Sequence, residues 1–140
     1  DPTAIEVHGR RVLLSHGDAL CTDDASYQAF RAQVRSPAWA AAFLARPLAE
    51  RKAEIEALRA RSEAEKKVKS AQIMDVNPQA VEALLRAHGY PTLIHGHTHR
   101  PARHEHLVDG HACERWVLSD WHGNGSCLAG DARGFRPEVF

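Results

Sequence analysis

The stretch "LIHGHTHRP", residues 93–101, carries three histidines within five positions. It begins with apolar residues typical of a strand and ends in Arg-Pro, which is typical of a turn. In an extended segment, side chains two positions apart point the same way, so His97 and His99 are expected to face one region. Gly96 lets the backbone approach that region closely. His95 lies inside the predicted strand, and we expect its ring to be a satisfied hydrogen-bonding partner that supports its neighbours.

A second polar corner is predicted at "SHGD", residues 15–18. The apolar run 11–15 predicts a strand that leads directly into it, and strand ends commonly present catalytic groups in α/β folds. Neutral imidazole binds several divalent metals, and a catalytic metal usually has three or more protein ligands. His16 is therefore the expected third contributor, and Asp18 could orient a ligand. The alternative is a polar loop that is merely rich in histidine.

The rest of the chain alternates strands and helices in a pattern typical of a layered α/β domain. Alternating or apolar runs bounded by turn residues predict strands at 5–7, 11–15, 92–95, 104–108, 113–118, 126–129 and 135–140. Capping residues and apolar periodicity predict helices at 25–35, 38–45, 48–69 and 78–88.

The composition limits the classes of protein that the chain can represent. Its 140 residues form at most one domain by size, and 44% apolar content supports a globular fold. The formal net charge is zero, so no overall field favours nucleic acid as a partner. Three scattered cysteines without a CxxC motif favour a reducing, cytosolic setting over a disulfide framework. No apolar run approaches the roughly 20 residues that a membrane span needs.

Four motifs are distinctive when taken together: "HGDALCTDDASYQAFR" (16–31), "SAQIMDVN" (70–77), "LIHGHTHRP" (93–101) and "VLSDWHGNGS" (117–126). With them the sequence closely resembles the UDP-2,3-diacylglucosamine pyrophosphatases (hydrolases) of lipid A biosynthesis, within the calcineurin-like metallophosphoesterases. The resemblance covers essentially the whole chain and implies the C-terminal part of a four-layer α/β/β/α sandwich. Residues 1–140 would then be one partial domain, with a helical lid insertion at about 24–70.

The resemblance also implies roles for individual residues. His16 and His97 would bind one metal of a dinuclear Mn²⁺ site, and His99 would bind the other. The substrate contacts that it implies are Asp24, Ser62, Lys66, Lys69 and His97, with Tyr27 and Arg59 as weaker candidates. From the residues alone, Asp24 is a helix N-cap, and the cluster Lys66, Lys67 and Lys69 is either a set of point charges for a diphosphate or a solvated helix face.

The reaction implied by the resemblance is hydrolysis of the pyrophosphate bond of UDP-2,3-diacylglucosamine. A metal-activated water would attack the α-phosphorus, releasing UMP and 2,3-diacylglucosamine 1-phosphate (lipid X). His97 would be catalytic by stabilising the developing charge. A lipid substrate implies a peripheral position on the cytoplasmic face of the bacterial inner membrane. Trp39, Phe43, Leu44 and Leu48 could form an apolar groove for acyl chains, dip into the membrane surface, or simply pack within the lid.

The family pattern includes Asp-x-His, Gly-Asp and Gly-Asn-His/Arg-Asp motifs that supply the remaining ligands, and none of them precedes His16. The letters "DWHGN" at 120–124 resemble two of them, but they follow the histidine cluster and overlap, so we interpret them as coincidental. Two divalent ions ~3.5–4 Å apart repel each other and need bridging anions, which three neutral imidazoles do not supply. We therefore expect a missing N-terminal half to complete the fold. Alone, the chain should hold metal poorly and hydrolyse little.

Two other functions stay open at this point. One is a generic metallophosphoesterase with a soluble substrate, and the other is a non-catalytic fragment that binds metal or lipid. The first predicts turnover of simple phosphodiesters, and the second predicts no Mn²⁺-dependent turnover at all.

Overall fold

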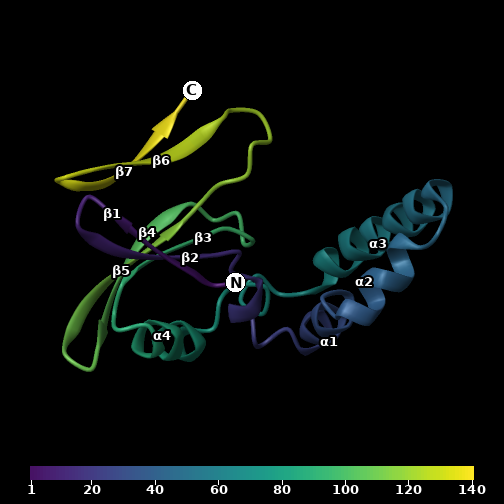
Figure 1. Cartoon of the computed structure of the whole chain (residues 1–140), viewed down its shortest axis with the longest axis horizontal. Coiled ribbons are helices and arrows are strands. Elements are labelled where there is room, and N and C mark those ends of the chain that lie inside the picture. Colours follow the sequence, from purple (N-terminus) through teal and green to yellow (C-terminus); the bar gives the residue numbers. More distant parts are fainter. The chain divides into compact units, whose positions relative to one another are not determined.

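The computed structural model describes residues 1–140, apart from the side chain of Lys66. The chain forms two compact units (Figure 1). The sheet unit consists of residues 1–21 and 76–140, and the helical unit consists of residues 22–75. The role of the helical region as a lid stays a prediction. Within the described chain, no helix combines the length and the apolar character that crossing a bilayer requires.

The sheet unit is built on a mixed five-stranded sheet with the order β1-β2-β3-β5-β4. Neighbours β2–β3 and β3–β5 are parallel, whereas β1–β2 and β4–β5 are antiparallel pairs. This arrangement confirms the predicted α/β class. The strands are β1 (Thr3–Val7), β2 (Arg10–Ser15), β3 (Thr92–His95), β4 (Ala102–Val108) and β5 (His111–Val117).

Helix α4 (Pro78–Ala87) supplies the core on one face of this sheet (Figure 1). Val81 and Leu85 lie one turn apart and are fully buried, as are Leu13 of β2 and Leu93 of β3. Burying each such side chain stabilises the fold by roughly 1.5–3 kcal/mol. The amphipathic stripe that the sequence predicted therefore fixes α4 against the two central parallel strands.

The ends of α4 follow the capping signals in the sequence. The side chain of Asn77 accepts a hydrogen bond from the backbone N–H of Ala80 at 3.0 Å, and Pro78 occupies the first helical position. At the other end, Gly89 adopts a φ of 72° and the N–H of Tyr90 donates to the carbonyl of Leu85 at 2.8 Å. The chain then enters β3 directly.

A separate antiparallel pair completes the sheet unit. It consists of β6 (Ser126–Asp131) and β7 (Gly134–Val139). The guanidinium of Arg10 donates to the carbonyl of Arg133 at 3.3 Å, which links the turn of this pair to β2.

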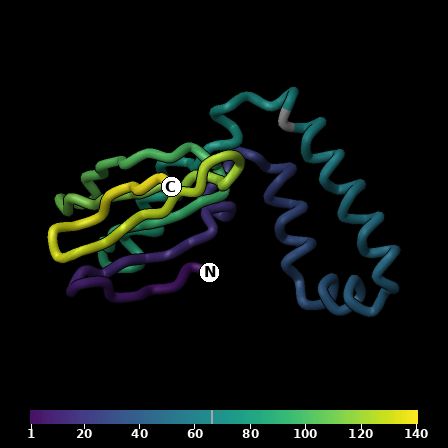
Figure 2. The backbone as a smooth tube through the Cα atoms, turned by 90° about the horizontal axis from the view of Figure 1, so that it is seen from above, coloured from purple at the N-terminus to yellow at the C-terminus, as the bar shows by residue number. Residues whose placement is uncertain are grey.

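The helical unit contains α1 (Ala25–Val34), α2 (Pro37–Leu44) and α3 (Leu48–Val68). Its chain runs out along α1, turns through α2 and returns along α3 (Figure 2). Each observed helix ends within one residue of its predicted bounds. The side chain of Ser36 accepts from the N–H of Trp39 at 3.2 Å and so caps α2, while Pro47 precedes α3.

Candidate functional site

The parallel pairing of β2 and β3 brings the two histidine-bearing segments to one edge of the sheet. In the register of this pair, Ser15 lies opposite His95. The residues that follow each strand therefore leave the sheet side by side. The N–H of Gly96 donates to the carbonyl of His16 at 3.2 Å, which joins the two segments directly.

Gly17 is the point of closest approach between them. It adopts a left-handed φ of 99°, and a Cβ added there would lie 2.7 Å from Nδ1 of His95 and 3.1 Å from the carbonyl oxygen of Gly96. Only glycine fits this position without displacing the neighbouring segment. The rings of His16 and His97 consequently lie close, with their centroids 5.1 Å apart and tilted by 55°.

The segment that carries His97 and His99 is a tight turn, and the prediction that it is extended is wrong. β3 ends at His95, and the N–H of Thr98 donates back to the carbonyl of Gly96 at 2.8 Å. This three-residue turn gives His97 a φ of 66°, and His99 follows with a φ of 51°. Left-handed backbone at two non-glycine residues costs free energy, and such strain concentrates at functional sites.

A carboxylate contacts the first of these histidines. Nδ1 of His16 lies 3.0 Å from Oδ1 of Asp18, whose side chain is buried. The ring itself is half-exposed. A carboxylate beside Nδ1 leaves Nε2 available to a ligand, which is the arrangement typical of metal-binding histidines. The structure thus places Asp18 beside His16, and its role in orienting that ring stays a prediction.

His99 has a comparable partner, which the sequence did not identify. Its Nδ1 lies 3.2 Å from Oδ2 of Asp120, just beyond β5. Asp120 belongs to the "DWHGN" letters that we interpreted as coincidental. The signal that could have found it is its position after an apolar strand, because β5 lies parallel to β3 and both end at the same edge.

These imidazoles suit a divalent metal but do not complete a site for one. Among the residues that the structure describes, no three His, Cys, Asp or Glu side chains are placed to hold a single ion. Neutral nitrogen donors with Nδ1 held by a carboxylate are appropriate ligands. A site for two divalent ions also needs anionic ligands. The binding of metal by His16, His97 and His99 therefore stays a prediction.

Apart from His97, the predicted substrate residues lie in the helical unit, where Lys69 forms an ion pair with Asp24. The ammonium of Lys69 donates to both oxygens of Asp24 at 2.8 Å, to the hydroxyl of Ser26 at 2.9 Å and to Glu65 at 3.2 Å. Asp24 also accepts from the N–H of Tyr27 at 3.0 Å, so its predicted N-cap role is confirmed.

Charge in this cluster is stabilised by hydrogen bonds despite burial. Burial alone would raise the pKa of Asp24, but hydrogen bonds from Lys69, Tyr27 and Ser26 lower it below its ordinary value. Burial likewise opposes the charge of Lys69, whose pKa is nevertheless raised by Asp24 and Glu65. Lys69 is therefore held as a cation.

The other predicted substrate residues are less tightly placed. Tyr27 and Ser62 line a cavity of about 70 Å³ between α1 and α3, beside Phe30 and Leu58. Arg59 is exposed on α3, and the side chain of Lys66 lies outside the described residues. The predicted site residues thus form two groups, the histidines in the sheet unit and the others in the helical unit.

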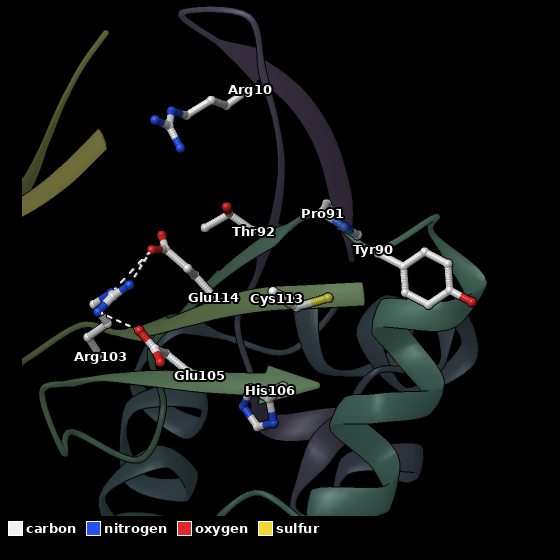
Figure 3. Close-up of a pocket in the computed structure, with 10 residues that line it drawn as sticks. Arg10, Tyr90, Pro91, Thr92, Arg103, Glu105, His106, Cys113 and Glu114 are labelled. Carbon is white, nitrogen blue, oxygen red and sulfur yellow. Dashed lines mark hydrogen bonds and ion pairs between the residues drawn. The ribbon is translucent and has the colours of Figure 1, made fainter. Parts of the chain in front are cut away.

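A larger cavity, of about 350 Å³, lies in the sheet unit (Figure 3). None of the predicted site residues lines it. Its cation Arg103 lies 2.6 Å from Oε1 of Glu114 and 2.8 Å from Glu105, as the dashed lines in Figure 3 mark. A second cation, Arg10, also lines the cavity, so two arginines stand against two glutamates and the lining has no excess of positive charge for a phosphate.

The mixed α/β fold, with imidazoles gathered at its strand ends, is typical of metal-assisted hydrolases. No protein-family model matches the chain. Curated relatives do, and they bear the name UDP-2,3-diacylglucosamine hydrolase. The chain is 63% identical to the one from Aromatoleum aromaticum over 134 residues, which is 96% of this chain and 55% of that protein. It is 58% identical to the one from Chromobacterium violaceum over 138 residues, covering 97% and 56% respectively.

A third relative, from Bordetella pertussis, is 55% identical over 121 residues, or 86% of this chain and 47% of that protein. The chain thus spans about half the length of the curated relatives that it matches. The predicted resemblance to UDP-2,3-diacylglucosamine hydrolases is confirmed over most of the chain.

Proposed function

We propose that the chain is part of a hydrolase that cleaves the pyrophosphate bond of UDP-2,3-diacylglucosamine, releasing UMP and 2,3-diacylglucosamine 1-phosphate. The names of the relatives, at 54–63% identity in five organisms, support this activity. The observation that carries it is the meeting of His16 and His97 at the ends of adjacent parallel strands. In this proposal the sheet unit is the C-terminal part of a four-layer sandwich, and the helical unit is its lid.

His16, His97 and His99 are the proposed metal ligands, with two Mn²⁺ ions in the complete site. When bound, such ions polarise the phosphate and lower the pKa of a water. Asp18 and Asp120 hold the rings of His16 and His99 so that their Nε2 atoms stay available. His97, on its tight turn, lies beside His16 and stabilises charge that develops on the phosphate.

The anionic ligands are proposed to come from a companion segment. The relatives are about twice as long as the matched region. A preceding N-terminal half of the same fold would supply the carboxylates that neutral imidazoles cannot replace. It is therefore a partner that the activity requires.

The helical unit is proposed to bind the substrate. Together with His97 of the sheet unit, Asp24, Ser62, Lys66 and Lys69 would contact it, with Tyr27 and Arg59 as weaker contributors. The Trp39 and Phe43 rings stack at 4.8 Å between centroids, so they pack on each other. The exposed Leu44 and Leu48 would then contact either the acyl chains of the substrate or the membrane surface. We propose that the protein lies on the cytoplasmic face of the bacterial inner membrane.

The test is release of UMP from UDP-2,3-diacylglucosamine with Mn²⁺. The 140-residue chain would be compared with a chimera that carries the N-terminal half of the Aromatoleum aromaticum relative. We expect turnover from the chimera and little from the chain alone. His16→Ala and His99→Ala in the chimera should each abolish it. His88→Ala, at the opposite end of the sheet, is the matched histidine control and should not.

Other outcomes separate the rival functions. Turnover of a simple phosphodiester, but not of the lipid nucleotide, would support a generic phosphoesterase. A folded chimera with no Mn²⁺-dependent turnover of either would support a non-catalytic module. Full activity of the chain alone would refute the need for further carboxylates.

A further inference from the structure

A chain of buried polar side chains lies beneath the histidine turn. His95 is fully buried and Arg115 of β5 is buried. Nη1 of Arg115 lies 3.1 Å from Nε2 of His95, and its Nε lies 3.1 Å from Nε2 of His106 on β4. Nδ1 of His95 lies 3.0 Å from the carbonyl oxygen of Gly96. One guanidinium on β5 therefore joins two imidazoles on β3 and β4, the strands that flank it.

The chemistry of the donors fixes the tautomer of His95. A carbonyl oxygen only accepts hydrogen bonds, so Nδ1 must carry the proton that faces Gly96. A guanidinium only donates, so Nε2 of His95 must be the acceptor. These two contacts thus assign the proton to Nδ1 and the acceptor role to Nε2. The same reasoning makes Nε2 of His106 an acceptor, and burial, together with Arg115, lowers the pKa of His106 and favours its neutral form.

The backbone around His95 is fixed by the same network. The carbonyl of Gly96 accepts both from Nδ1 of His95 and from the N–H of Thr98 at 2.8 Å. The carbonyl of His95 accepts from the N–H of Leu118 at 2.8 Å. Gly17 packs close to this ring, since a Cβ added there would lie 2.7 Å from Nδ1 of His95. If the ring rotated, or if its proton moved from Nδ1 to Nε2, His95 would lose its hydrogen bond to the carbonyl of Gly96. Gly96 is the residue where the turn begins.

We infer that Arg115 is a positioning residue: by donating to Nε2 of His95 it fixes the tautomer of that ring, and through Gly96 the turn that carries His97 and His99. The bonds described above lead from Arg115 to His95 and from His95 to Gly96, so Arg115 acts on the turn through His95. The effect of Arg115 on hydrolysis rests on the proposed function. Its effects on the tautomer of His95 and on the turn can be tested without that function.

The first test needs no substitution. In the ¹⁵N-labelled 140-residue chain, two-bond ¹H–¹⁵N correlations distinguish Nδ1-protonated from Nε2-protonated imidazole. We expect His95 to be the Nδ1-protonated tautomer. A ring protonated at Nε2, or at both nitrogens, at neutral pH would overturn the inference.

The second test removes the guanidinium. Arg115→Met keeps a long apolar stem but no donor, and should move His95 toward a mixture of tautomers. Amide hydrogen exchange at Thr98 should become ~10-fold faster, while exchange at Val81 in α4 stays unchanged. Arg115→Lys retains a cationic donor and should restore part of both effects. Arg103→Met, which removes an exposed arginine from the adjacent strand, is the matched control and should change neither.

A folded Arg115→Met variant with an unchanged tautomer and unchanged Thr98 exchange would refute the role. In the chimera, Arg115→Met should lower turnover ~10-fold or more, in the range typical of residues that orient metal ligands. If the chimera is inactive even before substitution, the proposed function fails, while the tautomer and exchange results still decide the role of Arg115.

Discussion

The ammonium of Lys69 lies 2.8 Å from both carboxylate oxygens of Asp24, although the two residues are 45 positions apart in the chain. Asp24 begins α1 and Lys69 ends α3, so this contact closes the helical unit at the open end of its three helices. Both side chains are mostly shielded from solvent, which protects the pair from screening.

Lys69→Met should destabilise the helical unit by about 1–3 kcal/mol, since Asp24 then loses a charged hydrogen-bond partner in a mostly buried position. Urea unfolding followed by helical circular dichroism measures this change. The N–H of Tyr27 donates a hydrogen bond to Asp24, and its hydrogen exchange should become faster. Lys67→Met removes an exposed lysine two residues earlier and is the matched control. Equal effects of the two substitutions would show that the contact contributes nothing.

The Arg86–Asp109 pair makes the sheet unit sensitive to acid. Hydrogen bonds from Arg86, at 2.6 and 3.0 Å, and from the hydroxyl of Tyr90, at 3.0 Å, lower the pKa of Asp109 to about 2. Since this folded-state pKa lies below the ordinary 3.8, the stabilisation is fully present above about pH 4 and is lost as the pH falls toward 2. Asp109 adopts a φ of 52°, a conformation that asparagine tolerates, so Asp109→Asn isolates the charge.

The free energies of unfolding of the wild type and Asp109→Asn should differ by a constant amount from pH 7 to 5 and converge between about pH 4 and 2. Arg86→Leu removes the partner and should show the same convergence. Urea titrations at each pH measure both. A difference that persists undiminished at pH 2 would contradict the assignment.

Gly17→Ala should destabilise the sheet unit more than an ordinary glycine substitution in a left-handed turn. The new Cβ would add backbone strain at φ 99° and a collision with the buried His95 ring and the Gly96 carbonyl. Strain of this kind costs about 1–3 kcal/mol, and the collision adds to it. Gly110→Ala is the matched control, because Gly110 has a φ of 82° but no neighbour within 4 Å. Indistinguishable thermal stabilities would mean that the two histidine segments do not pack closely at Gly17.

Features that depend on residues close together in the sequence could be predicted, whereas features that depend on the pairing of distant strands could not. The N-caps Asp24 and Asn77 were predictable because a capping side chain bonds to a backbone N–H only three residues later. The contact of Asp18 with His16 is similarly local. The contact of Asp120 with His99 was not predictable in this way, because it depends on the parallel pairing of β3 with β5.

The turn at His97 escaped prediction for a different reason. The sequence predicted an extended segment from the strand that precedes it, but a backbone bond from Thr98 to Gly96 reverses the chain immediately after β3. Side-chain periodicity carries no information on such a bond. His95 was correctly expected to be satisfied within the strand, whereas its partner Arg115 comes from a strand 20 residues away.

The exposed leucines of the helical unit predict binding to a lipid surface. Leu44 ends α2 with 63% of its side chain exposed, and Leu48 begins α3 with 58% exposed. Trp39 stacks on Phe43 in α2, close to Leu44, so its fluorescence can report a change in the surroundings of this helix end. If Leu44 and Leu48 enter the interface of a phospholipid vesicle, each contributes up to about 1.5–3 kcal/mol, so their joint replacement by serine should weaken binding ~10-fold or more.

Co-sedimentation with phosphatidylethanolamine–phosphatidylglycerol vesicles measures this binding, and a blue shift of the tryptophan emission should accompany it. Leu107→Ser is the matched control, since Leu107 is a 75%-exposed leucine on β4 of the sheet unit. It should leave vesicle binding unchanged. If the wild type fails to sediment with vesicles, or if Leu107→Ser weakens binding as much as the paired substitution, these leucines do not form a membrane contact.

The apolar end of α2 would then be available to the acyl chains of the substrate. In that case the paired substitution should lower hydrolysis of the long-chain lipid but leave hydrolysis of a short-chain analogue unchanged.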